Sequence, residues 1–374
     1  MGVTLSGVKT EAAFEFDRYC CDTIKENKRA KHPLVGGWSL HEADVRFADF
    51  KQYEDQLDLI SGGPPCQPFS LGGKHRAFRD SRDLWSEAVR ATREARPKAF
   101  LFENVKGLTR EAFSNYYEYI YLQLTYPELH RRSDESWSDH LSRLEKHHTS
   151  RRAQRGLSYR VVRRVLNAAK YGVPQKRERV FFIGFRSDLD LEFSFPDETH
   201  SLDALIWDQV ISGDYWERHR VPKRERIVSE RVRQRGERLS DKPSLLPWLT
   251  TRDAIADLPR PTLKGSDDVL NHRLQPGARS YPGHTGSALD EAAKTLKAGV
   301  HGVPGGENMI ALPSGEVRYL TVRESARLQT FPDDFIFHGS WTETMRQLGN
   351  AVPVRLSECV SRAIVTQLEA VELR

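Results

Sequence analysis

The 374-residue chain has few cysteines and no long hydrophobic stretch. Its four cysteines form no CxxC pair and no paired Cys/His spacing, which argues against a disulfide framework and a zinc site. No apolar run approaches the ~18 residues of a membrane span, and the start MGVTLSGVKT lacks the apolar core of a signal peptide. Mean hydropathy is −0.61. The sequence therefore predicts a cytoplasmic protein without a metal site or a membrane partner.

Charge is nearly balanced along the chain. Lys and Arg number 57 against 52 Asp and Glu, a net charge of +5, which permits a polyanionic partner without requiring one. Basic clusters lie at 151–155, 176–179 and 223–242, the last with eight Lys or Arg and four Asp or Glu. Taken singly, each cluster is equally well explained as a solvated surface.

Short apolar runs alternate with helical patterns in the first half of the chain. We expect strands in 10–17, 57–61, 99–105 and 179–186, a strand followed by irregular chain in 159–174, and helices in 18–28 and 81–97. This alternation predicts an α/β fold with a parallel, doubly wound sheet. Residues 107–158 interrupt it with an aromatic helical stretch and a polar segment, 130–152, which we expect to be a surface insertion.

The composition changes after about residue 190 to Trp, Pro, Gly and charged residues. The segment 346–374 then has the pattern of an amphipathic helix entered through a Gly-Asn turn. We therefore expect a catalytic α/β domain in 1–186, a smaller irregular domain in 187–342, and a C-terminal helix in 343–374 that returns to the first domain.

Cys66 lies in a stiff turn, SGGPPCQPFS. The prolines Pro64, Pro65 and Pro68 each fix φ and remove a backbone donor, so the turn can be neither helix nor central strand. The preceding run LDLIS has the pattern of a buried strand. Cys66 is thus expected as a free thiol at the carboxyl end of a strand, where open α/β folds place their sites.

Four motifs occur in order: PCQPFS at 65–70, ENV at 103–105, QKRER at 175–179 and GNAVPV at 349–354. Each is common alone, but together they are specific. With LNAAKYGVPQKRERVFFIGF and TVRESARLQTFPDDF, they resemble the C5-cytosine-specific DNA methyltransferases over nearly the whole chain. The resemblance implies a Rossmann-like methyltransferase sheet with a target recognition domain, S-adenosylmethionine as methyl donor, and a flipped cytosine in double-stranded DNA as acceptor.

The chemistry of cytosine methylation accounts for the catalytic residue types. C5 is a poor nucleophile until a thiolate adds at C6, the role that falls to Cys66. Glu103, expected in an apolar setting that keeps it protonated, would donate toward N3 and read the exocyclic amine. Arg177 and Arg179, two apart on a strand edge, are expected to share a face and to hold the base carbonyl and a phosphate. The resemblance places Arg179 nearer the reactive centre.

The resemblance also implies a set of contacts to the cofactor. Glu15 follows an apolar strand, as the acid that binds a ribose diol does in dinucleotide folds. Phe16 and Val45 are expected against the adenine and Asp44 at its amine. The remaining contacts that the family supplies are matched by Pro65, Leu84 and Asn350.

The family opens with a strand and a Phe-x-Gly-x-Gly turn that this sequence lacks. Only residues 1–9 precede the strand matched to the second motif. Because the missing strand is central in the family, we expect unpaired edges on the strands at 10–17 and 57–61. We therefore expect an N-terminally shortened chain that, alone, binds S-adenosylmethionine poorly or not at all.

Three functions are consistent with the sequence. The first is a DNA (cytosine-5)-methyltransferase of a prokaryotic restriction-modification pair, monomeric on nucleoid DNA, with a cognate restriction endonuclease encoded nearby. The second is an RNA (cytosine-5)-methyltransferase that uses the same chemistry. The sizeable basic domain favours DNA over RNA, but only weakly. The third is a DNA-binding relative that has lost catalysis, and cofactor binding separates it from the other two.

Cys66→Ala is expected to abolish methyl transfer and to leave duplex binding intact or stronger, because the thiolate is lost while the flipped base gains room. The measurements are methylation rate and duplex affinity. Turnover above about a thousandth of wild type, a loss smaller than ~4 kcal/mol, would contradict covalent catalysis by this residue.

Overall fold

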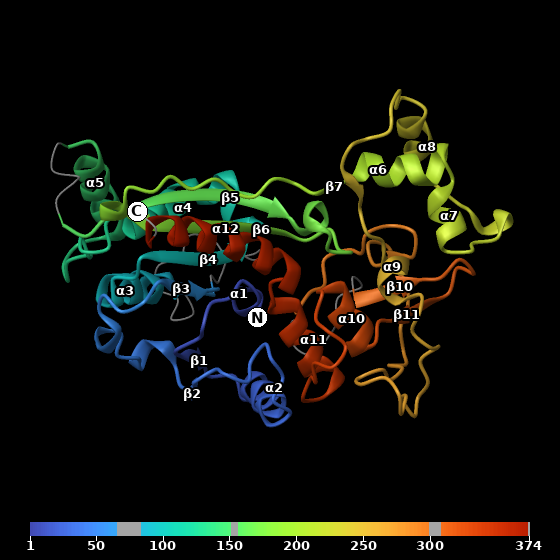
Figure 1. Cartoon of the computed structure of the whole chain (residues 1–374), viewed down its shortest axis with the longest axis horizontal. Coiled ribbons are helices and arrows are strands. Elements are labelled where there is room, and N and C mark those ends of the chain that lie inside the picture. Colours follow the sequence, from blue (N-terminus) through green and yellow to red (C-terminus); the bar gives the residue numbers. More distant parts are fainter. Residues whose placement is uncertain (66–83, 151–155, 299–307, 373–374) are drawn as a thin grey trace. The chain divides into compact units, whose positions relative to one another are not determined.

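The computed structural model describes residues 1–65, 84–150, 156–298 and 308–372 (Figure 1). The chain forms two units, each built from segments that are distant in sequence. Unit 1 comprises Met1–Glu42, Asn167–Arg177 and Pro196–Arg362, and unit 2 comprises Ala43–Leu166, Glu178–Phe195 and Ala363–Arg374. Each is described by itself below. Among the described residues, every helix is too short or too polar to cross a bilayer.

Unit 2 is organised around a four-stranded sheet. The strands are β3 (Leu59–Gly62), β4 (Ala99–Val105), β6 (Glu178–Arg186) and β5 (Tyr159–Asn167), in the order β3-β4-β6-β5. Helix α3 (Trp85–Ala95) connects β3 to β4, which run parallel. The expected strands and helix of this region are confirmed, and so is the α/β class.

The expectation of an all-parallel sheet is wrong at β6, which runs antiparallel to β4. The chain between β5 and β6 contains only the short 3₁₀ helix η6 (Ala168–Tyr171) and an irregular segment. A parallel neighbour needs a crossover connection of a dozen or more residues, usually a helix, and this connection is too short for one. Both β4 and β6 are buried over most of their length, as expected of central strands.

The segment expected as a surface insertion instead contributes to the core of unit 2. It contains helix α5 (Trp137–His148), which packs beside the aromatic helix α4 (Ser114–Thr125). Leu141 and Leu144 are buried with Tyr119 in one cluster. The buried His140 bonds to the Tyr119 hydroxyl at 2.8 Å. The segment is polar by composition, but its apolar residues recur at helical spacing, so one face is buried.

Unit 1 contains a parallel pair of short strands, β1 (Ala13–Glu15) and β2 (Leu40–Glu42), joined through helix α2 (Arg18–Arg29). Among the described residues, β1 pairs with β2 alone. In unit 2, β3 likewise pairs with β4 alone within the described part of the chain. Each strand therefore keeps one edge without a strand partner, as the sequence predicted.

The rest of unit 1 is made of short elements around a second core. Its helices are α1 (Gly2–Leu5), α6 (Leu202–Ile206), α7 (Asp214–Arg218), α8 (Glu230–Gly236), α9 (Thr251–Ile255), α10 (Val322–Leu328) and α11 (Trp341–Asn350). Its further strands are β7 (His200–Ser201), β8 (Leu246–Pro247), β9 (Ser287–Ala288), β10 (Met309–Ala311) and β11 (Val317–Tyr319). Helices α10 and α11 supply much of the buried core.

The C-terminal part of the chain forms two helices, where the sequence predicted one. The Gly-Asn dipeptide ends α11, and α12 (Val354–Glu372) starts four residues later, after Pro353. Proline is tolerated where a helix begins, because an N–H at that point would have no intrahelical partner. The Gly-Asn pair is therefore a helix end, with Asn350 exposed.

Leu144→Ala is expected to lower the free energy of unfolding by about 2–5 kcal/mol, because it opens a cavity in the core of unit 2. Ser142→Ala, at an exposed position of the same helix, should change it by less than about 0.5 kcal/mol. Urea denaturation followed by circular dichroism measures both. Equal effects of the two substitutions would mean that α5 is a surface appendage.

Candidate active site

Glu103 and Arg179 form a buried ion pair in unit 2. Glu103 lies near the carboxyl end of β4 and Arg179 at the start of β6, diagonally across the antiparallel ladder. The Arg179 Nε lies 2.7 Å from Glu103 Oε1, and the two side chains are 10% and 12% exposed. Burial lowers the pKa of the Arg179 guanidinium, and the Glu103 carboxylate partly offsets this. The sequence predicted these two residues at one site, and the structure brings them together.

The apolar setting expected for Glu103 is not observed. The Arg179 guanidinium lies at hydrogen-bond distance from the Glu103 carboxyl group, so the surroundings of this group are not apolar. The backbone of Gly63 also lies close to the Glu103 carboxylate, since a Cβ placed on Gly63 would lie 3.4 Å from Glu103 Oε2. Glu103 is therefore positioned between a cation and the turn that precedes Cys66.

Cys66 lies outside the described residues, but the residues that flank 66–83 are held by hydrogen bonds. Asn104 Nδ2 donates to the Pro64 carbonyl at 2.8 Å. The Leu84 amide donates to the Pro65 carbonyl at 3.2 Å, so the residues on either side of 66–83 are hydrogen-bonded to each other. Asn104 was not singled out from the sequence beyond its place in the ENV motif. The signal in the sequence is an amide residue directly after the predicted catalytic carboxylate. In the structure this amide joins β4 to the turn before Cys66.

Arg177 does not occupy the position expected for it. Its side chain is fully buried in unit 1. The guanidinium donates to the carbonyls of Leu296 at 2.9 Å, Gly349 at 2.6 Å and Ala351 at 2.9 Å. The alternation rule fails because β6 begins at Glu178, so Arg177 precedes the strand. The structure gives no support to a contact between Arg177 and a base or phosphate.

The predicted cofactor residues of unit 1 lie at element ends. Glu15 ends β1, and its Oε1 accepts hydrogen bonds from the amides of Phe16 and Asp17, both at 2.9 Å. The other oxygen, Oε2, has no hydrogen-bond partner among the described residues. The Phe16 ring is 72% exposed. An oriented carboxylate thus lies beside an uncovered aromatic ring.

In unit 2, Asp44 and Val45 form a turn at the start of the 3₁₀ helix η1 (Val45–Phe47). Hydrogen bonds from Arg46 hold the pKa of Asp44 below its usual range. Arg90, on α3, donates to the Val45 carbonyl at 2.9 Å and to Ala48. Sequence reasoning missed Arg90, because a helical arginine that reaches a distant turn has no local signal.

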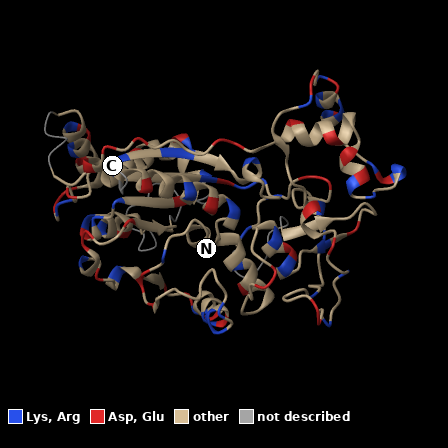
Figure 2. Cartoon of the chain, in the orientation of Figure 1, with Lys and Arg blue, Asp and Glu red and all other residues tan. Residues whose placement is uncertain are grey.

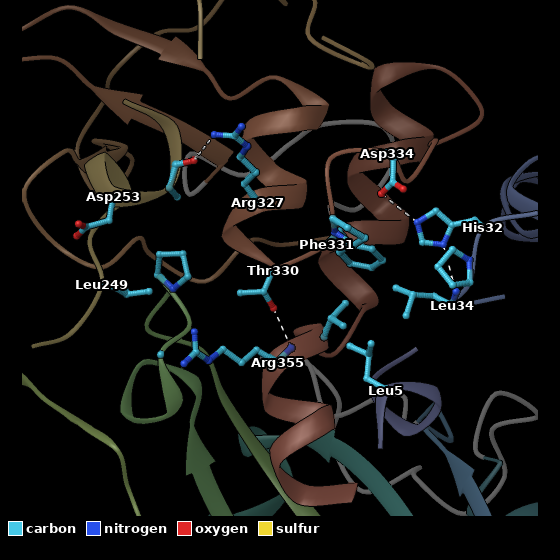
Figure 3. Close-up of a pocket in the computed structure, with 16 residues that line it drawn as sticks. Leu5, His32, Leu34, Leu249, Asp253, Arg327, Thr330, Phe331, Asp334 and Arg355 are labelled. Atoms are coloured by element: carbon cyan, nitrogen blue, oxygen red, sulfur yellow. Dashed lines mark hydrogen bonds and ion pairs between the residues drawn. The ribbon is translucent and has the colours of Figure 1, made fainter. Parts of the chain in front are cut away.

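A cavity of about 560 Å³ lies in unit 1 (Figure 3). It is lined mainly by apolar side chains, among them Leu34, Phe331 and Val354, with Arg355 at one side. None of the predicted catalytic or cofactor residues lines it. In the described part of the chain, no cluster of three or more His, Cys, Asp or Glu is arranged to hold a metal ion.

The basic run 223–242 is interspersed with acids around α8 (Figure 2). Two of its arginines form close ion pairs, Arg226 with Glu217 at 2.7 Å and Arg235 with Asp203 at 2.6 Å. Within the run 223–242, the exposed cations without an ion pair to a described residue are Lys223, Arg231, Arg238 and Lys242. These four leave part of the run available to a polyanion.

Residues 1–126 and 145–366 match the family model described as C-5 cytosine-specific DNA methylase. The chain is 30% identical to the Type II methyltransferase M.Eco47II of Escherichia coli, over 100% of this chain and 78% of that protein. It is 27% identical to M.NgoMIV of Neisseria gonorrhoeae, over 99% and 94%. The unmatched residues 127–144 include the first part of α5.

Solved structures show the same fold. A DNA modification methyltransferase encoded within an E. coli prophage superposes with a TM-score of 0.58 at 20% identity, covering 98% of this chain and 95% of that one. The Dnmt2 methyltransferase of S. pombe superposes with a TM-score of 0.53 at 14% identity, covering 99% and 94%.

Arg179→Met is expected to lower the free energy of unfolding by about 3–5 kcal/mol, because it leaves the Glu103 carboxylate buried without its cation. Adding Glu103→Gln should recover part of the loss. The control is Lys106→Met, which breaks the exposed ion pair with Glu178 and should cost less than about 1 kcal/mol. If the double variant were as unstable as the sum of the single changes, the pair would not be coupled.

Proposed function

We propose that this chain methylates C5 of a flipped cytosine in a specific duplex sequence, with S-adenosylmethionine as methyl donor. The premise is that the chain belongs to the C-5 cytosine-specific DNA methylase family. The observation that carries this proposal is the buried Glu103–Arg179 pair beside the anchored start of the Cys66 loop. A carboxylate and a guanidinium beside the residues that precede Cys66 form a set that, together with its thiol, can bind and activate a cytosine ring.

Different residues of the chain act on different atoms of the cytosine ring. The Cys66 thiolate adds to C6, and the electron pair of the C5–C6 double bond moves into the ring, which makes C5 nucleophilic. Arg179, next to the base, stabilises the negative charge that develops on N3 and the carbonyl oxygen. Glu103 holds this guanidinium in place and accepts from the exocyclic amine. After methylation, water removes the C5 proton and the bond to sulfur breaks, which regenerates the thiolate.

The residues expected at the cofactor fit the chemistry of an adenosine. The Glu15 carboxylate has an oxygen available to accept from a ribose hydroxyl, and the exposed Phe16 ring offers a surface for stacking. Asp44 can accept from an adenine amine, with Val45 beside it. Pro65, Leu84 and Asn350 complete the proposed set. Bound S-adenosylmethionine would supply an electrophilic methyl group.

Duplex DNA is the proposed substrate, read by a target recognition domain in 187–342, while 1–186 and the C-terminal segment 343–374 carry the chemistry. The exposed cations of the 223–242 run suit phosphate contacts, which set register but not sequence. The relatives at 27–30% identity are named Type II methyltransferases, which favours DNA over RNA. A cognate restriction endonuclease, a monomer on DNA and a cytoplasmic location complete the proposal.

A duplex carrying 5-fluorocytosine is expected to trap the protein covalently in the presence of S-adenosylmethionine, because fluorine cannot leave C5 as a proton does. The measurement is a protein–DNA band that survives denaturing electrophoresis. Cys66→Ala should give no band. Glu103→Gln should form it about 10²–10³ times more slowly with unchanged cofactor affinity, because a neutral amide holds the Arg179 guanidinium less firmly than a carboxylate does.

Three results would contradict the proposal or one of its assignments. Wild-type protein that binds S-adenosylmethionine and duplex but forms no adduct would reject the reaction. Trapping by a 5-fluorocytosine RNA, and not by the duplex, would move the activity to RNA. Loss of cofactor binding in Glu103→Gln would place that residue in the other half of the site.

A further inference from the structure

We propose that Arg177 is a positioning residue that fixes the turn around Asn350 to the segment 293–298, and thereby couples cofactor binding to target binding. The proposal rests on the proposed function, in which Asn350 contacts the cofactor and 293–298 lies in the target recognition domain. Arg177, Asn350 and this segment all belong to unit 1.

The Arg177 guanidinium joins two segments that are distant in sequence. One terminal nitrogen, Nη2, donates to the carbonyls of Gly349 and Ala351, the residues on either side of Asn350. The other, Nη1, donates to the carbonyl of Leu296. Because the side chain is fully buried, water cannot replace these partners. Moving either segment alone would leave a buried cation and buried carbonyls without partners, which is costly.

Other buried side chains hold the segment 293–298 in the same place. The Gln175 side chain, fully buried, accepts from the Leu296 amide at 3.0 Å and donates to the Leu328 carbonyl at 3.2 Å. Asn308 exchanges two hydrogen bonds with the backbone of Lys297, at 3.0 and 2.9 Å. The segment is thus fixed through its main chain, whichever side chains it carries.

Close packing at Gly349 adds a second link between the two segments. A Cβ at Gly349 would lie 2.2 Å from the Ala298 nitrogen, so only glycine allows α11 to approach this backbone. Gln329, the residue that follows α10, donates to the Leu348 carbonyl at 2.6 Å. The end of α11 and the segment 293–298 therefore form one rigid piece, with Asn350 exposed at its surface.

A rigid link of this kind has a thermodynamic consequence. Because the two segments move as one piece, a ligand that restrains the Asn350 turn also restrains the segment 293–298, so a second ligand on that segment loses less conformational freedom when it binds. By linkage, each ligand then raises the affinity for the other by the same factor. A typical coupling is about 5–150-fold.

The structure supplies a matched control for Arg177. Arg323 is also fully buried in unit 1 and also donates to three backbone carbonyls, those of Leu270, Pro332 and Phe335, at 2.8–3.0 Å. None of these partners lies in 293–298 or 349–351. Replacing Arg323 by Lys therefore removes equivalent bonds without touching the proposed link.

The first test compares Arg177→Lys with Arg323→Lys in the full chain. The target site is located by bisulfite sequencing of plasmid DNA methylated by the wild type. Affinity for S-adenosylhomocysteine is then measured by calorimetry with and without a duplex carrying that site. We expect the duplex to raise the affinity at least about 5-fold in wild type and Arg323→Lys, and less than about 2-fold in Arg177→Lys. Equal coupling in both variants, or no coupling in wild type, would overturn the proposal.

The second test does not depend on activity. Hydrogen exchange measured by mass spectrometry should show faster exchange in Arg177→Lys in peptides covering both 293–298 and 349–353. Arg323→Lys should instead accelerate exchange near 270 and 332–335. If Arg177→Lys does not fold, the wild type is compared with and without S-adenosylhomocysteine, which should slow exchange in 293–298 as well as in 349–353. Unchanged exchange in either segment would refute the link.

A wild-type chain that neither binds S-adenosylhomocysteine nor methylates DNA would contradict the proposed function. The exchange pattern would then still decide whether Arg177 joins the two segments, so the two failures are distinguishable.

Discussion

The arrangement of the candidate site depends on the ion pair between Glu103 and Arg179. Burying two charges is costly unless the geometry is good, and here the antiparallel ladder of β4 and β6 provides it by placing both side chains on one face. The ladder forms because both strands are apolar and buried along most of their length. The same end of β4 carries Asn104, whose bond to Pro64 fixes the turn before Cys66.

Features that depend on local sequence were predictable, and those that depend on distant pairing were not. The apolar run of β4 and the amphipathic pattern of α3 predicted the positions of these two elements to within a few residues. The direction of β6 was not predictable from its own residues, because it follows from the short connection to β5 and the pairing with β4. Arg90 and Asn104 were missed for the same reason, since their partners are about 40 residues away along the chain.

The helix α5 shows how composition can mislead when periodicity is weak. Charged and histidine residues dominate 130–152, yet Trp137, Leu141 and Leu144 recur at intervals of three or four and pack against the core. Burial requires only one face of a helix to be apolar. A segment can therefore be polar on average and still be indispensable to packing.

The QKRER motif shows that residue type alone does not assign a role. Arg177 and Arg179 are two residues apart, but the division between the units falls after Arg177. Arg179 is on a strand and pairs with a carboxylate, whereas Arg177 precedes the strand and donates three hydrogen bonds to backbone carbonyls of remote segments. The cation beside a carboxylate at the strand end can respond to charge on a bound base. The cation enclosed by carbonyls cannot, and it acts through the backbone that it holds.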